Sequence, residues 1–557
     1  MPAPAFTWST YEVLVAPPEG RLRAAAEAPD VGAAPQAVVV ELPDLTDWPQ
    51  PLDKARILLE SAAEVEHALM VQYLYAAYSL KDAREVTDAA QQIALDDTSA
   101  ESWPQLLLSI AREEMGHLMT VQNLLLALGL APNLEREDFP PRKDLYPFAL
   151  HLEPLSQRSL AKYVLAEAPA DAEGIEDIVE LVRESAGTTI NRVGVLYGLL
   201  GLVFSTEGDL RRGASGHADW DALMSELSLA AYQQSAPQSW HLPDGAIDPR
   251  SASYQADPDD WQVGGLRVHR VTDRAAAVQA IRDVGEQGEG PTSEGEQSHF
   301  GRFLSIYRGD GGMPAFPAAG DWVATRDVPT DPKVDVDISE PRTRRWAELV
   351  DLRYALLLGF VEHYLLTGGH ARRILTAWIF AEMRSRVGFV ARELTTMPRA
   401  GAATTGPVAA VPFTLPSVLH LADDAAGWAL HRERTEAAIM KVEEMQAADH
   451  VDEADSYLVD LLASDRARLV FIEAGATGPE TSFARDIMPL FRSKDVKHMI
   501  ANSTLDLSQY ESVREESADI ARRIASRGRP MPPPPDQRWT KVQIALFEQW
   551  IAEGHPD

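Results

Sequence analysis

The sequence predicts a mainly α-helical protein: a four-helix bundle with long insertions, an additional helical hairpin and a small all-α C-terminal domain. Apolar residues recur at three-to-four-residue spacing through several long segments, which is the period of one helix face. Stretches rich in Gly and Pro separate these segments. A Glu-x-x-His pattern also occurs in more than one of them, and its acid and imidazole project from the same side of a helix.

Length and composition indicate a soluble globular protein with more than one domain. The chain has 557 residues, of which 45% are hydrophobic and 24% charged, as is typical of folded soluble proteins. A chain of this length is expected to hold about two to four domains. The start has no secretory pattern, and no run of about 18 to 20 apolar residues occurs. We therefore expect a soluble, cytoplasmic protein.

Charge and cysteine content restrict the partners and cofactors. Lys and Arg total 51 against 84 Asp and Glu, so the formal net charge is -33. This charge opposes binding to nucleic acid and to anionic membranes, and a small-molecule substrate is the expected partner. A homo-oligomer or a pathway partner enzyme is also compatible with the sequence. Cysteine is absent, which excludes disulfides, cysteine-ligated zinc or iron–sulfur clusters and covalently attached c-type haem.

The organisation along the chain follows from changes in composition. Residues 1–50 are rich in Ala and Pro and contain one β-type apolar run, at 37–42. They are expected to form a lead-in or a cap. We expect the bundle at residues 51–310 with an insertion at 208–292, an additional helical region packing on the bundle at 340–450, and a small helical domain at 457–557.

The first bundle helix is predicted at residues 52–80. Its apolar stripe at three-four spacing contains a single acid, Glu66. Tyr73 lies on the same stripe and is our candidate catalytic residue, with a role in the core as the alternative. The neighbouring Glu64 and His67 are expected to lie around the site or at the surface.

The second bundle helix is predicted at residues 102–129. Its apolar stripe contains Glu114 and His117, three residues apart. Glu113 falls on another face, together with small and polar residues, and is expected to face solvent. A wholly apolar portion marks the third helix, at about 177–204.

A second Glu-x-x-His pattern, Glu296 and His299, begins the fourth helical segment. Two strong helices follow at residues 345–367 and 371–396, and Gly368 and Gly369 between them stop the first. These two helices should form an antiparallel hairpin.

Within that hairpin, Glu362 lies on an apolar stripe. We expect it to form an ion pair with a neighbouring Arg, such as Arg386, rather than to bind a metal. A further helix is expected at about residues 425–448.

Buried acids in the bundle require a compensating cation. Burying an isolated ionised carboxylate costs roughly several kcal/mol of folding free energy, unless the group takes up a proton. Iron or manganese suits carboxylate and imidazole ligands that a four-helix bundle presents to its interior. A lone Glu-x-x-His is most often a solvated pair, but two copies on apolar stripes favour a metal site. The candidate ligands are Glu66, Glu114, His117, Glu296 and His299.

At these residues the chain resembles the ferritin-like family of iminophenyl-pyruvate dimer synthases, which act in bisindole-pigment biosynthesis. The resemblance lies in VEHALMVQYLYAAYSL at 65–80, IAREEMGHLMTVQNLLLALG at 110–129 and GEGPTSEGEQSHFGRFLSIY at 288–307. It implies a ferritin-like bundle, the same five metal-site candidates, and chemistry on amino-acid-derived imines or keto acids. Non-haem iron is the implied cofactor, with non-covalent haem as an alternative.

One position departs from the family pattern. Where relatives carry a carboxylate on the third helix, this chain has Val195, and no Asp or Glu occurs between Glu184 and Glu207. A symmetric two-iron site uses about four carboxylates and two histidines. Mononuclear iron, an asymmetric dinuclear site and a degenerate site are all compatible with the sequence.

The C-terminal region resembles a cytochrome-c-like helical domain in SFARDIMPLFRSKDVKHM at 482–499 and MPPPPDQRWTKVQIALFEQWIAEG at 531–554. Without cysteine it cannot hold haem covalently, so we expect a haem-free interaction or capping module. We expect the whole protein to be a metal-dependent oxidoreductase of secondary metabolism. The alternative from another class is a non-catalytic scaffold with a degenerate metal site.

Overall fold

The computed structural model describes most of the chain and divides it into two compact units, residues 1–325 (unit 1) and 326–557 (unit 2). The described residues are 7–15, 36–139, 150–169, 172–186, 193–212, 217–261, 266–289, 298–310, 312–317, 324–401, 406–417, 420–448, 453–473, 481–503, 505–525, 539 and 541–556. No helix among them is long and apolar enough to cross a membrane.

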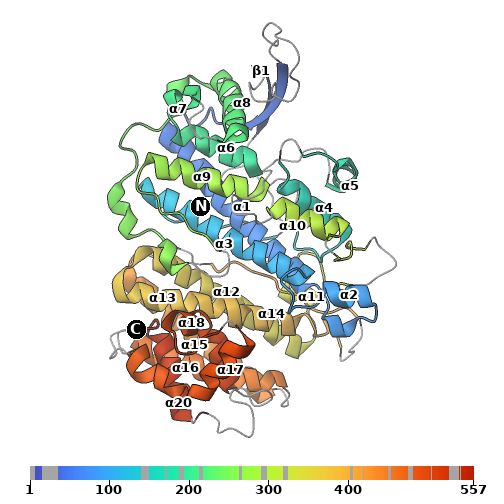
Figure 1. Ribbon diagram of the computed structural model, residues 1–557, viewed down its shortest axis with the longest axis vertical. Coiled ribbons are helices and arrows are strands. Elements are labelled where there is room, and N and C mark those ends of the chain that lie inside the picture. Colours follow the sequence, from blue (N-terminus) through green and yellow to red (C-terminus); the bar gives the residue numbers. More distant parts are fainter. Residues whose placement is uncertain are drawn as a thin grey trace. The chain divides into compact units, whose positions relative to one another are not determined.

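The described elements of unit 1 are helices and one two-stranded antiparallel sheet (Figure 1). Its elements are β1 (Trp8–Val15), β2 (Gln36–Pro43), α1 (Pro51–Tyr78), η2 (Ala83–Glu85), α2 (Ala89–Ala94), α3 (Trp103–Ala127), α4 (Gln157–Ala166), α5 (Glu176–Ala186), α6 (Val193–Phe204), α7 (Glu207–Arg212), α8 (Ala218–Gln234), η3 (Pro237–Ser239), η4 (Pro249–Ser253), η5 (Pro258–Asp260), α9 (Arg274–Glu289) and α10 (His299–Arg308). The predicted β-type run is β2, which pairs antiparallel with β1, and the hairpin packs on α8.

Four helices of unit 1 form a bundle, but its fourth member is α9 and not the predicted fourth segment, which begins at Glu296. Helix α1 packs against α3 and α6, and α9 completes the ring by packing against both α6 and α3 (Figure 1). Helix α10 packs on α4 and also touches α3 and α9. The segment 208–292, expected to be an insertion, thus carries α9, the bundle helix that lies beside α6.

The two central helices begin and end where the sequence predicts. Pro residues occupy the first turns of both α1 and α3, where the missing N–H costs no hydrogen bond. Gly129 adopts a positive φ of 73° directly after α3, a conformation that glycine tolerates best. Both helices are buried along most of their length, which explains why their sequences are apolar on more than one face.

The face of α3 that carries Glu113 was expected to meet solvent. This expectation is wrong, because other segments of the protein cover that face. The loop 266–271 runs along it, where His269 N–H donates to Thr120 Oγ1 at 3.1 Å and Asn123 Nδ2 donates to His269 O at 2.8 Å. At Gly116 an added Cβ would lie 2.4 Å from Arg267 O. Small and polar residues lie on this face because a backbone approaches it closely.

Unit 2 is entirely helical among its described elements. These are α11 (Val334–Asp337), α12 (Pro341–Leu366), α13 (Gly369–Ala381), the π-helical turn η6 (Glu382–Val387), α14 (Gly388–Leu394), α15 (Asp424–Ala448), α16 (Glu453–Glu473), η7 (Phe483–Ile487), η8 (Met488–Leu490), α17 (Ser493–Asn502), α18 (Tyr510–Glu515), α19 (Ser517–Ala525) and α20 (Lys541–Ala552). Helices α12 and α13 form the predicted hairpin, and α15 packs on α12 and α16.

Buried charges connect the helices of unit 2, but not in the predicted pairing. Arg386, the arginine suggested as the partner of Glu362, is not that partner: Arg386 Nη1 donates to Glu382 Oε1 at 2.7 Å. Glu362 Oε1 accepts from the backbone N–H of Leu421, and the arginine that interacts electrostatically with Glu362 is Arg434. Glu382 also accepts from Nε of the fully buried Arg353 at 2.9 Å. The π-helical turn at Glu382 lies at the centre of this network.

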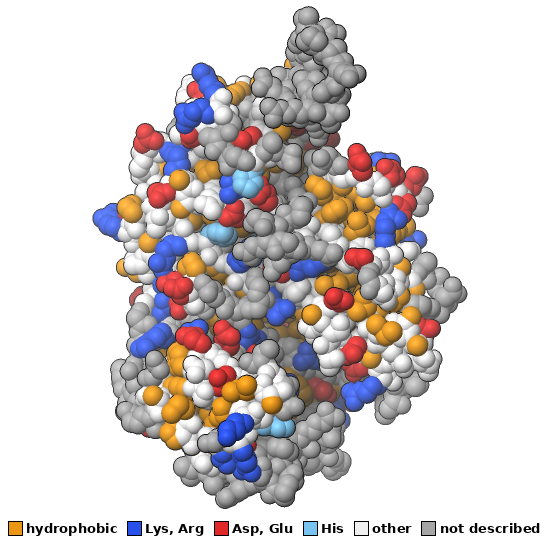
Figure 2. Space-filling model, in the orientation of Figure 1, with side chains coloured by type: hydrophobic (Ala, Val, Ile, Leu, Met, Phe, Trp, Pro, Cys, Tyr) orange, Lys and Arg blue, Asp and Glu red, His pale blue; other side chains and the backbone are white. Residues whose placement is uncertain are grey.

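The last four helices surround a core of their own. Phe483, Ile487, Phe547 and Trp550 are among its buried side chains, and Met531 lies outside the described residues. On the molecular face in Figure 2, the described Lys and Arg side chains are interspersed with Asp and Glu.

We expect Gly116→Ala to lower the free energy of unfolding by about 1 to 3 kcal/mol, because the new Cβ would collide with the Arg267 carbonyl. Denaturant unfolding monitored by circular dichroism measures the loss. Gly368→Ala is the matched control, since nothing lies within 4 Å of an added Cβ there. Equal stability of the Gly116 variant and wild type would contradict the close approach of the loop.

A second prediction concerns Glu548 on α20, whose burial, together with nearby Asp460, raises its pKa to about 7 from 4.5. A raised carboxyl pKa favours the folded state at low pH, and this contribution is lost as pH rises from about 4.5 through 7. Glu548→Gln should therefore raise the unfolding free energy at pH 8 by about 1 to 3 kcal/mol, and much less at pH 5. Urea unfolding at both pH values tests this, with exposed Glu436→Gln as control; a gain independent of pH would exclude the effect.

Candidate metal centre

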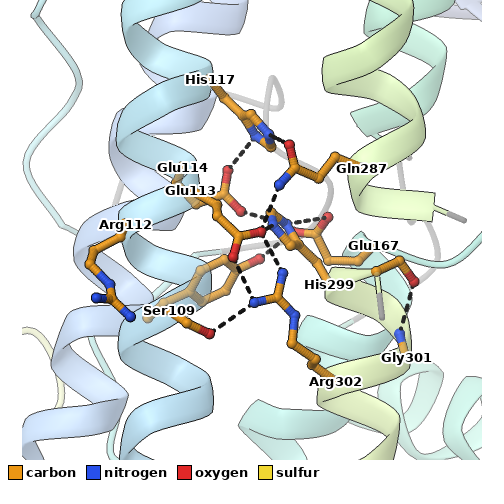
Figure 3. Close-up of polar contacts among 12 residues, drawn as sticks. Ser109, Arg112, Glu113, Glu114, His117, Glu167, Gln287, His299, Gly301 and Arg302 are labelled. Carbon is orange, nitrogen blue, oxygen red and sulfur yellow. Dashed lines mark hydrogen bonds and ion pairs between the residues drawn. The ribbon is translucent and has the colours of Figure 1, made fainter. Parts of the chain in front are cut away.

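Four of the predicted ligands meet inside the bundle, together with an acid that the sequence reasoning missed. Glu66 comes from α1, Glu114 and His117 from α3, and His299 from the first turn of α10. The additional acid is Glu167, the residue that follows α4. All five residues are buried, with exposed fractions of 5% or less, and Figure 3 shows the side chains of Glu114, His117, Glu167 and His299 converging.

The donor atoms are close enough to share cations. His117 Nδ1 lies 3.0 Å from Glu114 Oε2 and 3.4 Å from Glu66 Oε2. His299 Nδ1 lies 3.0 Å from Glu114 Oε1 and 3.6 Å from Glu167 Oε2. Both imidazole rings therefore turn the same nitrogen, Nδ1, toward the carboxylates.

These side chains form two overlapping donor sets. The Glu66 set consists of Glu66, Glu114 and His117, and the His299 set consists of Glu114, Glu167 and His299. In each set, one ligand atom from every residue lies within 4.8 Å of the others. Glu114 belongs to both sets, and its two oxygens face different histidines. This arrangement suits a carboxylate that bridges two ions.

Protonation compensates part of the charge of the buried acids in the protein alone. Burial and the nearby Glu114 carboxylate raise the pKa of Glu66 to about 8. Burial would lower the pKa of His117, but Glu114 overrides it and raises the pKa to about 10. Burial would likewise raise the pKa of Glu114, yet His299 and His117 hold it well below its usual value. A divalent cation could replace these protons as the compensating charge.

Several donor atoms lack hydrogen bonds, as expected of metal ligands. Glu66 Oε2, Glu114 Oε1 and His299 Nδ1 are buried and have no hydrogen-bond partner among the described residues. The last two atoms are 3.0 Å apart but lack the alignment of a hydrogen bond. Buried polar atoms are rarely left in this state, so the residues present fit a bound cation.

Two tyrosines donate hydrogen bonds to the candidate ligands. Tyr197 on α6 donates its hydroxyl hydrogen to Glu66 Oε1. Tyr73 on α1 donates to Glu167 Oε1 at 2.6 Å. Burial raises the pKa of both phenols well above the usual value, so they remain protonated donors. Tyr73 therefore lies one hydrogen bond from a candidate ligand.

Glu113 is part of the site surroundings, so the expectation that it faces solvent is wrong. It receives a bidentate contact from Arg302 and lies 3.0 Å from His299 Nε2. Gln287 Nε2 on α9 also donates to it at 2.7 Å. The sequence pattern failed here because α9 and α10 cover this polar face of α3.

Glu167 carries the carboxylate that the third helix lacks. Val195 lies on α6, as predicted, whereas Glu167 reaches the centre from the end of α4. The missed signal was the spacing of Leu160, Val164 and Glu167, which places the acid on the apolar stripe of a short helix.

The remaining predicted residues have other outcomes. Glu296 lies outside the described residues. Glu64 and His67 are both fully buried, and His67 Nδ1 lies 2.9 Å from Leu134 O.

A cavity of about 20 Å³ borders both donor sets and is also lined by Val193, Gly194 and Val284. It has room for about one water-sized molecule.

Fold and centre together define a ferritin-like four-helix bundle with a buried carboxylate–histidine cluster. Residues 59–308 match the family model described as Ferritin-like. Every donor of both sets lies within this range. No solved structure matches the chain significantly.

The chain is also similar to two characterised proteins. Dichlorochromopyrrolate synthase from Lentzea aerocolonigenes is 27% identical over 275 residues, which cover 46% of this chain and 24% of that protein. The 2-imino-3-(indol-3-yl)propanoate dimerase from Chromobacterium violaceum is 33% identical over 151 residues, covering 23% of this chain and 15% of that protein. The chain thus spans about a quarter or less of the length of these relatives. Neither comparison supports the cytochrome-like reading of residues 457–557.

We expect Tyr73→Phe to lower the unfolding free energy by about 1 to 3 kcal/mol, because buried Glu167 loses a hydrogen-bond donor. Tyr163→Phe is a matched control: its ring lies 5.1 Å from that of Tyr73, and its buried hydroxyl has no hydrogen-bond partner among the described residues. The control should be neutral or slightly stabilising. Equal effects of both changes in chemical unfolding would argue against a role for the Tyr73 hydroxyl.

Proposed function

We propose that this protein is a non-haem metal-dependent oxidoreductase of secondary metabolism that acts on an amino-acid-derived imine or keto acid. Iron is the expected metal, and manganese suits the same ligands. The observation that carries the proposal is the sharing of Glu114 between two buried carboxylate–histidine sets. This sharing favours a dinuclear centre over a single ion.

Each ion would have three ligands from the described residues. Glu66, Glu114 and His117 would hold one, and Glu114, Glu167 and His299 the other. Glu167 would supply the carboxylate that relatives place on the third helix, so Val195 need not indicate a lost site. When bound, the metal would supply redox and Lewis-acid chemistry for the activation of dioxygen or peroxide.

The surrounding side chains control protons and water at this centre. Tyr197 and Tyr73 keep their hydroxyl protons directed at Glu66 and Glu167, which fixes the orientation of both carboxylates. In the proposed reaction Tyr73 is also the nearest phenol that could deliver a proton through Glu167. The water-sized cavity beside the donors limits access of solvent.

The substrate class is inferred from similarity and from cavity size. One relative is named for acting on 2-imino-3-(indol-3-yl)propanoate, an imine derived from an amino acid. A molecule of that size exceeds the cavity of about 20 Å³. We therefore propose that only its reacting end approaches the centre, past Val193 and Gly194, unless the bundle opens.

A non-catalytic scaffold is the second candidate function. It is favoured by the mutual neutralisation of Glu114 and the two histidines, which lets the cluster persist without any metal. Metal content separates the two candidates.

We expect protein purified without chelator to contain close to two iron or manganese ions per chain, measured by elemental analysis. Glu114→Gln should lose most of both ions because the residue serves both sets, whereas Glu167→Gln should lose about one. Glu180→Gln, on an exposed position of α5, is the matched control and should retain both ions.

Metal-free wild-type protein that stays metal-free after incubation with Fe²⁺ would reject the proposed function and leave the scaffold. A Soret band in the visible spectrum would instead indicate haem. Oxygen uptake with the oxidation product of an aromatic amino acid then tests the reaction, with Glu114→Gln as the inactive comparison.

A further inference from the structure

We infer that one carboxylate, Glu113, sets the orientation of both candidate histidine ligands: it holds His299 directly and His117 through the side-chain amide of Gln287. The inference rests on the proposed metal function for its purpose. The contacts themselves involve only side chains of this chain. Figure 3 shows the contacts of Glu113 with Arg302, Gln287 and His299.

The first step concerns the charge of Glu113. Arg302 Nη1 donates to Glu113 Oε1 at 2.8 Å, and Arg302 Nη2 donates to Oε2. A guanidinium is always a donor, so this two-point contact requires an ionised carboxylate. Arg302 is fixed in turn, since Nη1 also donates to Ser109 Oγ at 2.8 Å. Glu113 therefore acts only as an acceptor.

The second step follows for His299. Its Nε2 lies 3.0 Å from Glu113 Oε2, and because that oxygen can only accept, Nε2 must carry a hydrogen. The other ring nitrogen, Nδ1, then remains for the interior, where it faces Glu114 and Glu167. A carboxylate that fixes the tautomer of a histidine in this way is a common support of metal ligands.

The third step transmits the same constraint to His117. The amide of Gln287 lies between Glu113 Oε2, at 2.7 Å from its nitrogen, and His117 Nε2, at 3.1 Å from its oxygen. Facing an acceptor-only carboxylate, the amide must turn its NH₂ group toward Glu113 and its oxygen toward His117. His117 Nε2 must therefore also carry a hydrogen, which leaves Nδ1 directed at Glu66 and Glu114.

Glu113 therefore fixes the ring orientation of the histidine in each donor set. If either ring flipped or changed tautomer, an N–H or a C–H would face the candidate metal position. Loss of such supporting contacts typically weakens metal binding by about 10- to 100-fold. Glu113 and Gln287 are thus positioning residues, which act through the histidines and do not contact the proposed ions.

The test uses protein labelled with ¹⁵N-histidine and loaded with Zn²⁺ as a diamagnetic probe. Signals are assigned by their absence in His117→Ala and His299→Ala. In wild type we expect both rings to be coordinated through Nδ1 and protonated at Nε2. The variants are Glu113→Gln, which removes the shared acceptor charge, and Gln287→Met, which removes the amide while keeping a side chain of similar length.

Gln287→Met should move the Nε2–H signal of His117, leave that of His299 in place and weaken Zn²⁺ binding by about 10-fold. Glu113→Gln should move both signals. The double variant should bind little more weakly than Glu113→Gln, because the two residues act in one chain of contacts. Gln105→Met is the control: Gln105 is on the same helix as Glu113 and donates only to the backbone of Asp97.

Unchanged His117 signals in Gln287→Met, or coordination through Nε2 in wild type, would overturn the inference. A loss of Zn²⁺ affinity in Gln105→Met equal to that in Gln287→Met would also overturn the inference. Gln287 is only partly buried, so its variant stays informative if Glu113→Gln does not fold. If wild type binds no metal, the proposed function fails separately. Slowly exchanging Nε2–H protons on both rings of the metal-free protein would then still support the network, and their absence would refute it.

Discussion

The interior of unit 1 depends on compensating several carboxylates that the bundle removes from water. The buried Glu114 lies within reach of both Glu66 and Glu167, where like charges repel strongly. The apolar packing of α1, α3, α6 and α9 therefore tolerates them only if protons or a cation compensate their charge. His117 and His299 provide positive charge by protonation, or a cation provides it by coordination, and the same buried geometry serves both states.

Two faces of helix α3 contribute side chains to the buried cluster and to the contacts around it. Glu114 and His117 point into the centre, while Glu113, one residue before Glu114, points into a separate polar network that reaches back to the same two histidines. Consecutive residues on a helix diverge by about 100°, so neighbouring acids can reach opposite sides of the rings. The loop at 266–271 covers the rest of the second face, and the helix has little surface left for solvent.

The sequence predicted what depends on local periodicity. The stripes around Glu66 and Glu114 fixed two long helices and their inward faces, and the Glu-x-x-His spacing located His117 and His299. It could not predict contacts made by distant segments: Glu113 lies on a polar stripe that ordinarily faces water, but α9 and α10 return to cover it. Glu167 was missed because α4 is short and because the family pattern directed attention to Val195. Glu296 lies outside the described residues, so its role as a ligand remains a prediction.

The two donor sets differ in how firmly the chain holds them. Two ligands of the Glu66 set, Glu66 and His117, project from the middle of helices 28 and 25 residues long, where packing on every side fixes their rotamers. In the His299 set, Glu167 follows the end of α4 and His299 begins α10. Helix ends fray more readily than helix centres. A dinuclear centre built on these residues would therefore have one strongly held ion and one more exchangeable ion, with Glu114 transmitting changes between them.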